Sequence, residues 1–255
     1  MSPKKSKATM NPVASGLTDI GKRRSNNEDS FCILDKKKPT TFLYAIADGM
    51  GGHAAGEVAS ELTVKAIKSF FKRIDTDTIS SDIIIDLINK INEYVFYKAS
   101  TNPQLSGMGN TLSLLLILNN NKIVIGHVGD SRIYRLREKK FEQLTIDHTE
   151  VQAMIDAGQL SKEAARHHPL RNLIRQAIGA SKGLDNIFTL EEEALINDKY
   201  LLCSDGLTDM LEDEKIEEIL DCSATPDEAV NALIHAALEA GGRDNVTAIV
   251  VRIDQ

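Results

Sequence analysis

Tryptophan is absent from the 255-residue sequence, cysteine occurs only three times, and there is no long hydrophobic run. Cys32, Cys203 and Cys222 are odd in number and include no Cys-x-x-Cys pair, which argues against a disulfide framework and a cysteine-based zinc site. The longest apolar run, residues 112–118, is much shorter than the ~20 residues of a membrane-spanning helix. The lysine-bearing start of the chain lacks the apolar core of a signal peptide. We therefore expect a cytoplasmic protein without a membrane segment.

Positive charge is also scarce. Lys and Arg number 30 against 37 Asp and Glu, so the net charge is -7. This balance argues against a protein that binds nucleic acid by neutralising many phosphates. Three catalytic signatures are missing as well, namely GxxxxGK[ST], HExxH and GxSxG. Their absence argues against a P-loop nucleotide site, a zinc-protease helix and a serine-hydrolase elbow.

The remaining composition is typical of one globular domain. Hydrophobic residues make up 42% of the chain and charged residues 26%, as expected for a protein that buries a single large core. Residues 1–12, with several lysines and little that is apolar, predict a disordered basic tail. Residues 13–255 are expected to form a single domain.

Hydrophobic periodicity predicts the elements of this domain. Apolar residues recur at helical spacing over residues 58–71 and 84–95. Strand-forming runs then follow in close order at residues 111–118, 122–128 and 131–136. Helices followed by hairpin-spaced strands predict an α+β fold in which helices cover an antiparallel sheet.

A polar stretch, about residues 146–183, interrupts this strand pattern. Short helical pieces are expected within it at residues 150–157 and 171–178, ended by Gly158 and Gly179. We interpret the stretch as an insertion over one edge of the sheet.

Acidic corners adjoin several predicted strands. The apolar run 41–47 stops at Asp48, and glycines follow from Gly49 onward, which permit backbone angles that other residues resist. Acids also adjoin apolar strands at three later positions, Asp130, Asp205 and Asp244. An Asp-Gly pair alone can be no more than a turn. The interpretation therefore depends on whether these strand ends meet.

Carboxylates that meet in one place would repel one another unless they were protonated or held cations. Oxygen ligands without metal-spaced Cys or His favour Mg²⁺ or Mn²⁺ over zinc. Two such ions can activate one water for attack on a phosphorus or carbonyl centre. Arg24 carries a guanidinium able to hold two phosphate oxygens, although a solvated surface arginine would look the same in the sequence.

Six short blocks occur in order along the chain. They are Arg24-Ser-Asn-Asn-Glu-Asp29, Ala47-Asp-Gly-Met-Gly-Gly-His53, Gly107-Met-Gly-Asn-Thr111, Gly129-Asp-Ser-Arg132, Ser204-Asp-Gly-Leu-Thr-Asp209 and Arg243-Asp-Asn-Val246. In order and spacing they resemble the signature blocks of the bacterial PP2C-type (PPM family) metal-dependent serine/threonine protein phosphatases. The resemblance covers roughly residues 13–253.

This resemblance implies a two-sheet antiparallel β-sandwich flanked by helix pairs, with a metal site at one end. It implies two core ions, Mn²⁺ or Mg²⁺, and a third, weaker ion. By motif position the core ligands would be Asp48, Asp205, Asp244 and the carbonyl of Gly49. The third ion would be bound by Asp130, with Asp209 near it by pattern only.

The resemblance also implies catalytic roles. Arg24 matches the arginine that binds the substrate phosphate, and Glu28 and Asp29 match the pair that holds metal-bound waters. The implied reaction is direct attack of a metal-bridging hydroxide on phosphoserine or phosphothreonine, without a phosphoenzyme. Residues 146–183 would be the flap that shapes substrate access.

The histidines give a less direct match. Eukaryotic members of the family place a histidine directly after Asp-Gly as general acid, but Met50 holds that place here. His53 lies three residues further on, which leaves it open between catalysis and local capping or packing. His167 and His168 fall in the flap, where we expect surface positions.

The leading hypothesis is a monomeric phosphatase that acts on phosphoproteins and opposes a bacterial-type serine/threonine kinase. A second hypothesis is a catalytically silent module of the same fold that binds phosphoproteins. A third is a nonspecific hydrolase of small phosphate esters, which would use the same site.

Overall fold

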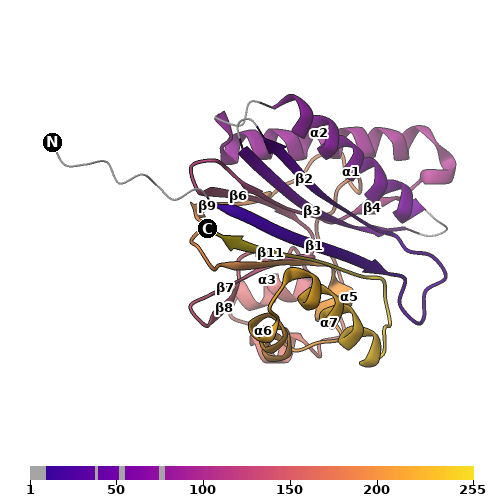
Figure 1. Cartoon of the computed structure of the whole chain (residues 1–255). Coiled ribbons are helices and arrows are strands. Elements are labelled where there is room, and N and C mark those ends of the chain that lie inside the picture. Colours follow the sequence, from indigo (N-terminus) through magenta and orange to yellow (C-terminus); the bar gives the residue numbers. More distant parts are fainter. Residues whose placement is uncertain (1–9, 38–39, 52–54, 75–77) are drawn as a thin grey trace.

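The computed structural model describes residues 10–37, 40–51, 55–74 and 78–255. Two β-sheets pack face to face, and helices cover the outer face of each, so the described chain forms four layers (Figure 1). All strand pairings are antiparallel. The predicted α+β class, with two antiparallel sheets flanked by helices, is therefore confirmed.

One sheet has the strand order β1-β11-β10-β7-β8. Its strands are β1 (Asn11–Asp19), β7 (Arg132–Arg137), β8 (Lys140–Gln143), β10 (Lys199–Cys203) and β11 (Val246–Asp254). The other sheet has the order β2-β3-β5-β6-β9, and the short β4 pairs with β3. Its strands are β2 (Asp29–Lys37), β3 (Thr40–Met50), β4 (Gly109–Asn110), β5 (Leu112–Ile117), β6 (Lys122–Val128) and β9 (Phe188–Glu193).

Helices cover the outer faces of the two sheets, and those over residues 55–73 and 81–101 bury the apolar stripes predicted from the sequence. On the second sheet lie α1 (Ala55–Arg73), α2 (Ser81–Thr101) and the 3₁₀ turn η2 (Pro103–Leu105). On the first sheet lie α5 (Asp205–Thr208), α6 (Asp213–Cys222) and α7 (Pro226–Glu239). A third apolar cluster fills the space between the sheets, where aliphatic side chains of both sheets meet around Tyr44 and Tyr200. Of the helices in the described part of the chain, none combines the length and apolarity needed to cross a membrane.

The predicted insertion contains α3 (Glu150–Asp156) and α4 (Lys162–Ala165). The helix predicted over residues 171–178 is wrong, because the backbone there makes isolated bridges to other segments. Ile178 pairs with Asn110, and Ile174 pairs with Thr149. Backbone groups that bond to distant segments cannot also complete helical bonds, so tertiary pairing overrides the local pattern.

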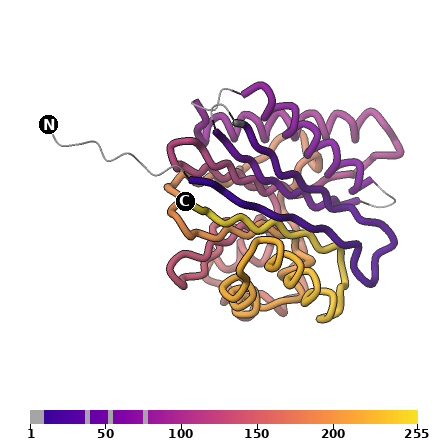
Figure 2. The backbone as a smooth tube through the Cα atoms, viewed as in Figure 1, coloured from indigo at the N-terminus to yellow at the C-terminus, as the bar shows by residue number. Residues whose placement is uncertain are grey.

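The two ends of the described chain lie side by side. Asn11 pairs with Asp254 across β1 and β11, and Figure 2 shows the indigo start of the trace running beside its yellow end. Asn11 and Pro12 already belong to β1, so the first strand starts before residue 13. The rest of the predicted tail, residues 1–9, lies outside the described residues.

The strand register brings the acidic corners to one end of the sandwich. Asp29 at the start of β2 pairs directly with Asp48 near the end of β3. In the other sheet Cys203, the last residue of β10, pairs with Arg132 and with Ala248. Asp205 lies two residues after Cys203, Asp130 two residues before Arg132 and Asp244 four residues before Ala248. All three aspartates therefore lie at the same end of this sheet.

Candidate metal centre

Asp29 joins the two sheets at this end. Its Oδ2 accepts hydrogen bonds from Ser204 Oγ at 2.8 Å, directly after β10, and from Thr247 Oγ1 at 2.6 Å, on β11 of the facing sheet. Its Oδ1 is buried and has no hydrogen-bond partner among the described residues. Burial raises the pKa of Asp29 to about 6, although the two hydroxyl donors act in the opposite direction. A buried oxygen without a partner is costly, so the site fits a further ligand or ordered water.

Asp48 and Asp205 lie among other acids at this end of the sandwich. Burial raises the pKa of each carboxyl well above its usual range, and neighbouring carboxylates raise it further. The acids that act on both residues come from other strand ends, namely Asp29, Asp130 and Asp244. Burial also raises the pKa of Asp130 to about 7, with Asp147 adding to the effect. The structure therefore brings together carboxylates that cannot all be charged without positive charge nearby.

Arg24 supplies positive charge at the rim. Its Nη2 lies 2.6 Å from Asp244 Oδ2, and the two side chains are 50% and 34% exposed. Glu28 is half-buried, and burial raises its pKa while Arg24 lowers it.

Gly49 lies where only a glycine fits. A Cβ there would come within 2.2 Å of the Gly56 carbonyl oxygen, and the Gly49 amide donates to the Glu28 carbonyl at 3.1 Å.

Asp209, at the end of α5, is held by residues of the insertion. Asn172 Nδ2 donates to Asp209 Oδ2 at 3.2 Å, and Arg171 Nη2 lies 3.7 Å from the same oxygen.

The donor set fits hard divalent cations, since it consists of carboxylate and backbone oxygens. Within the described residues, no group of three or more His, Cys, Asp or Glu side chains is arranged so that it could hold an ion by itself. Mg²⁺ is typically bound by one or two carboxylates, with water completing its coordination shell. Asp48, Asp205, Asp244 and Asp130 could contribute in this way, together with the Gly49 carbonyl.

The chain matches the family description "Protein phosphatase 2C" over residues 21–239. It belongs to the protein phosphatase 2C family. It is 39% identical over 239 residues to the serine/threonine protein phosphatase PstP of Mycobacterium tuberculosis, a match that covers 92% of this chain but 44% of PstP. The chain thus spans less than half of that relative. With the serine/threonine phosphatase stp of Listeria monocytogenes it shares 36% identity over 240 residues, 93% of this chain and 94% of stp.

Solved structures agree with this assignment. A crystal structure of the PstP catalytic domain in complex with two manganese ions matches this protein phosphatase 2C chain with a TM-score of 0.84 and 35% identity. The match covers 97% of this chain and 100% of the other.

Sequence reasoning did not assign a role to Asn245, which anchors the loop of this protein phosphatase 2C site. Its Oδ1 accepts from the Glu28 amide at 2.9 Å, and its Nδ2 donates to the carbonyls of Ile20 and Asn26, each at 2.9 Å. The buried Asn245 side chain therefore connects the loop before Asp29 to the segment that carries Asp244. The available signal was its place directly beside an acidic corner.

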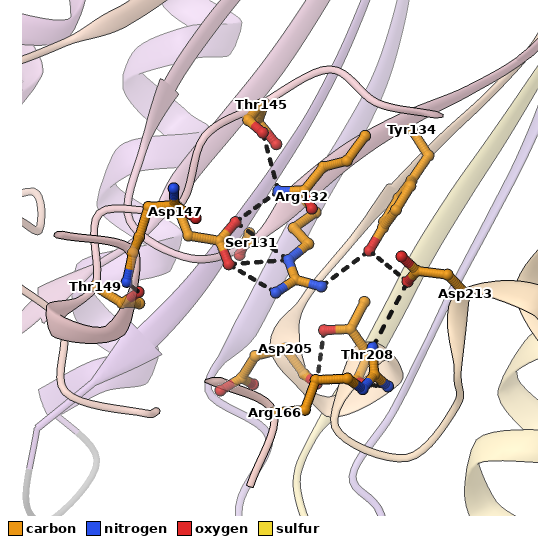
Figure 3. A network of polar contacts seen from close by, with 12 residues as sticks. Ser131, Arg132, Tyr134, Thr145, Asp147, Thr149, Arg166, Asp205, Thr208 and Asp213 are labelled. Carbon is orange, nitrogen blue, oxygen red and sulfur yellow. Dashed lines mark hydrogen bonds and ion pairs between the residues drawn. The ribbon is translucent and has the colours of Figure 1, made fainter. Parts of the chain in front are cut away.

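A second missed feature is the ion pair of Arg132 and Asp147 (Figure 3). Arg132 Nη2 and Nε lie 2.7 Å and 3.0 Å from Asp147 Oδ2. Arg132 Nη1 also donates to Tyr134 Oη at 3.0 Å, and Tyr134 donates to Asp213 at 3.2 Å. The network links Arg132, two residues after Asp130, to Asp147 at the start of the insertion and to Asp213 in α6. No sequence spacing predicts this pairing.

A cleft of about 1320 Å³ opens beside the acidic end of the sandwich. Its lining includes Asp130, Asp205 and Asp209 as well as residues of the insertion, among them Arg166 and His167. His167 is exposed and His168 half-buried. His53 lies outside the described residues.

Proposed function

We propose that this chain is a metal-dependent phosphatase of phosphoserine and phosphothreonine in proteins. The observation that carries the proposal is the meeting of Asp48, Asp130, Asp205 and Asp244 from separate strand ends, beside an arginine, in a protein phosphatase 2C chain. The names of the relatives, serine/threonine phosphatases, support the same activity.

Mn²⁺ or Mg²⁺ is the cofactor that this donor set would take. Asp48, Asp205, Asp244 and the Gly49 carbonyl would hold a core pair of ions, and Asp130, with Asp209 as a candidate, a third. Bound cations would supply Lewis-acid activation of a water and would neutralise charge that develops on the phosphoryl oxygens. They would also relieve the repulsion that raises the pKa of Asp48 and Asp205.

The side chains around the cations would orient the reactants. Arg24 reaches Asp244 from the rim, so its guanidinium can turn to bind two oxygens of a substrate phosphate. Glu28 and Asp29 are carboxylates with raised pKa values next to the proposed ligands, and they would hold the waters of the site by accepting hydrogen bonds.

The wider assignments are also proposals. Residues 13–255 would form one catalytic unit, in which the flap (residues 146–183) forms a wall of the cleft beside the carboxylates. A cleft of this size admits a phosphorylated segment of a protein, and we propose a target of a bacterial-type serine/threonine kinase as the substrate. We propose a monomer that acts in the cytoplasm, consistent with its free cysteines Cys32, Cys203 and Cys222.

The test is hydrolysis of a phosphothreonine peptide and of p-nitrophenyl phosphate, with Mn²⁺ or Mg²⁺ and then with excess EDTA. We expect turnover that EDTA abolishes and added metal restores. Asp205→Ala should lower turnover to background, whereas Asp86→Ala, at an exposed position on α2, should not. Activity that survives EDTA or Asp205→Ala would contradict the metal assignment. Phosphopeptide binding without hydrolysis would indicate the silent binding module instead.

A further inference from the structure

Thr111 lies between β4 and β5 and is fully buried. Two hydrogen bonds join it to the backbone of Asp48. The Thr111 amide donates to the Asp48 carbonyl at 2.8 Å, and the Thr111 hydroxyl accepts from the Asp48 amide at 3.0 Å. One of these bonds is made by the side chain, so it depends on which residue occupies this position.

The same side chain also contacts the Asp130 corner. Thr111 Oγ1 lies 2.7 Å from Ser131 Oγ, in a hydrogen bond between two buried hydroxyls. Gly129 has a φ of +109° and packs on Thr111, since a Cβ on Gly129 would come within 2.6 Å of Thr111 Cγ2. Thr111 therefore touches the residues on both sides of Asp130 as well as the main chain of Asp48.

Two further buried side chains, Ser113 and His127, stabilise the contact between Thr111 and Ser131. Ser113 Oγ donates to the Ser131 carbonyl at 3.1 Å and lies 2.8 Å from His127 Nδ1. Ser113 and His127 are both fully buried. Ser131 is thus held through its side chain by Thr111 and through its carbonyl by Ser113, which leaves it little freedom to shift.

Asp130 is buried and Asp48 half-buried, and the two acidic corners meet at Thr111, so negatively charged carboxylates at these corners would repel each other. Without cations, repulsion favours a wider separation of the two carboxylates. A binding site loses affinity when its ligands must first be brought back into place. Hydrogen bonds that hold the main chain of Asp48 and the neighbour of Asp130, Ser131, oppose that widening.

We propose that Thr111 is a positioning residue that sets the spacing between Asp48 and Asp130 and thereby the cation affinity of the site. The inference rests on the proposed metal-ligand roles of those two aspartates. The Thr111 hydroxyl is responsible for this effect on cation affinity, because the hydrogen bond from the Thr111 amide to the Asp48 carbonyl does not depend on the side chain. Partners that orient metal ligands typically change metal affinity by ~10–100-fold when removed.

The test compares Thr111→Val, which keeps the branched shape, with Thr111→Ser, which keeps the hydroxyl. Thr41→Val is the matched control, because Thr41 is also fully buried on β3, at the other end of the strand, and its hydroxyl has no partner among the described residues. Mn²⁺ affinity is measured by isothermal titration calorimetry on protein stripped of metal. The rise of Tm on Mn²⁺ addition and the KM for a phosphopeptide at saturating Mn²⁺ are measured in parallel.

We expect Thr111→Val to weaken Mn²⁺ binding by about tenfold, while Thr111→Ser and Thr41→Val bind as the wild type does. The phosphopeptide KM of Thr111→Val at saturating Mn²⁺ should be unchanged, because Thr111 does not reach the substrate. If Thr111→Val does not fold, Ser131→Ala removes the partner hydroxyl and should weaken Mn²⁺ binding in the same direction.

Wild-type Mn²⁺ affinity in Thr111→Val, or in a folded Ser131→Ala, would overturn the inference. Equal weakening in Thr111→Val and Thr111→Ser would overturn it too, since the hydroxyl would then not be responsible. A wild-type chain that binds no Mn²⁺ at all would instead overturn the proposed function, and with it this inference.

Discussion

Arg24 and Asp244 form an ion pair at the mouth of the metal centre, with 2.6 Å between Arg24 Nη2 and Asp244 Oδ2. The contact joins the residue proposed to bind substrate phosphate to a residue proposed to bind metal. Both side chains are partly exposed, so the pair contributes only about 0–1 kcal/mol to folding. Cation binding at Asp244 would therefore release the guanidinium for the substrate at little cost.

Arg24→Ala should lower kcat/KM for a phosphothreonine peptide by about 10–100-fold, because charge-assisted hydrogen bonds to the phosphate are lost. Steady-state kinetics at saturating Mn²⁺ measure the change. Arg23→Ala removes a neighbouring exposed arginine and should leave kcat/KM near the wild-type value. Equal losses in the two variants would contradict a specific phosphate role for Arg24.

Asp130→Asn should change how the stability of the metal-free protein depends on pH. Burial raises the pKa of Asp130 to about 7, above its value in the unfolded chain. The folded state then binds the proton more tightly, so the contribution of Asp130 to stability is full at low pH and is lost as the pH rises toward 7. Relative to Asp130→Asn, the wild type should become less stable as the pH rises from ~4 to ~7, that is, from the pKa of an unfolded aspartate to that of folded Asp130.

Urea denaturation of metal-stripped protein at a series of pH values measures that difference. Added Mn²⁺ should remove the disadvantage of the wild type at the upper end of the range, because a cation replaces the proton. A stability difference that stays constant with pH would show that Asp130 is not buried in the way the structure indicates.

Asn245→Ala should destabilise the loop before Asp29, since one buried side chain satisfies the Glu28 amide and the carbonyls of Ile20 and Asn26. We expect a loss of about 2–3 kcal/mol in the free energy of unfolding, as for buried groups left without partners. Amide hydrogen exchange of residues 20–28 should also become faster. Asn231→Ala, at an exposed site on α7, is the control and should change neither quantity.

Arg166→Met should loosen the flap. Arg166 Nη2 lies 2.7 Å from the Glu212 carboxylate and donates to the Leu211 carbonyl at 3.3 Å, so it connects the flap to the segment between α5 and α6. We expect faster hydrogen exchange over residues 146–183, with a global stability change below about 1 kcal/mol because the pair is partly exposed. Lys162→Met is the control, because it removes a positive charge of the flap that has no ion pair in the described part of the chain. Unchanged flap exchange in Arg166→Met would show that other contacts hold this segment.

Much of the fold follows from local pattern. The helical stripes around residues 58–71 and 84–95 became α1 and α2, and closely spaced β-forming runs became β5, β6 and β7. These predictions succeed because periodicity reports which face of an element is buried. The helix predicted over residues 171–178 fails because Ile178 exchanges backbone hydrogen bonds with Asn110, a partner that no local pattern reveals.

For the candidate site, the sequence by itself determined the types and positions of the acidic corners, Asp48, Asp130, Asp205 and Asp244. Only the tertiary structure shows why a glycine follows Asp48, since a Cβ at Gly49 would meet the Gly56 carbonyl oxygen. Tertiary structure alone decided that Asp29 receives Ser204 and Thr247 as donors, at sequence separations of 175 and 218 residues. It also decided that Thr111 contacts both Asp48 and the Asp130 corner. The chemical type of each residue can be read directly from the sequence. These contacts, in contrast, depend on the register and packing of two sheets that are built from segments far apart in the chain.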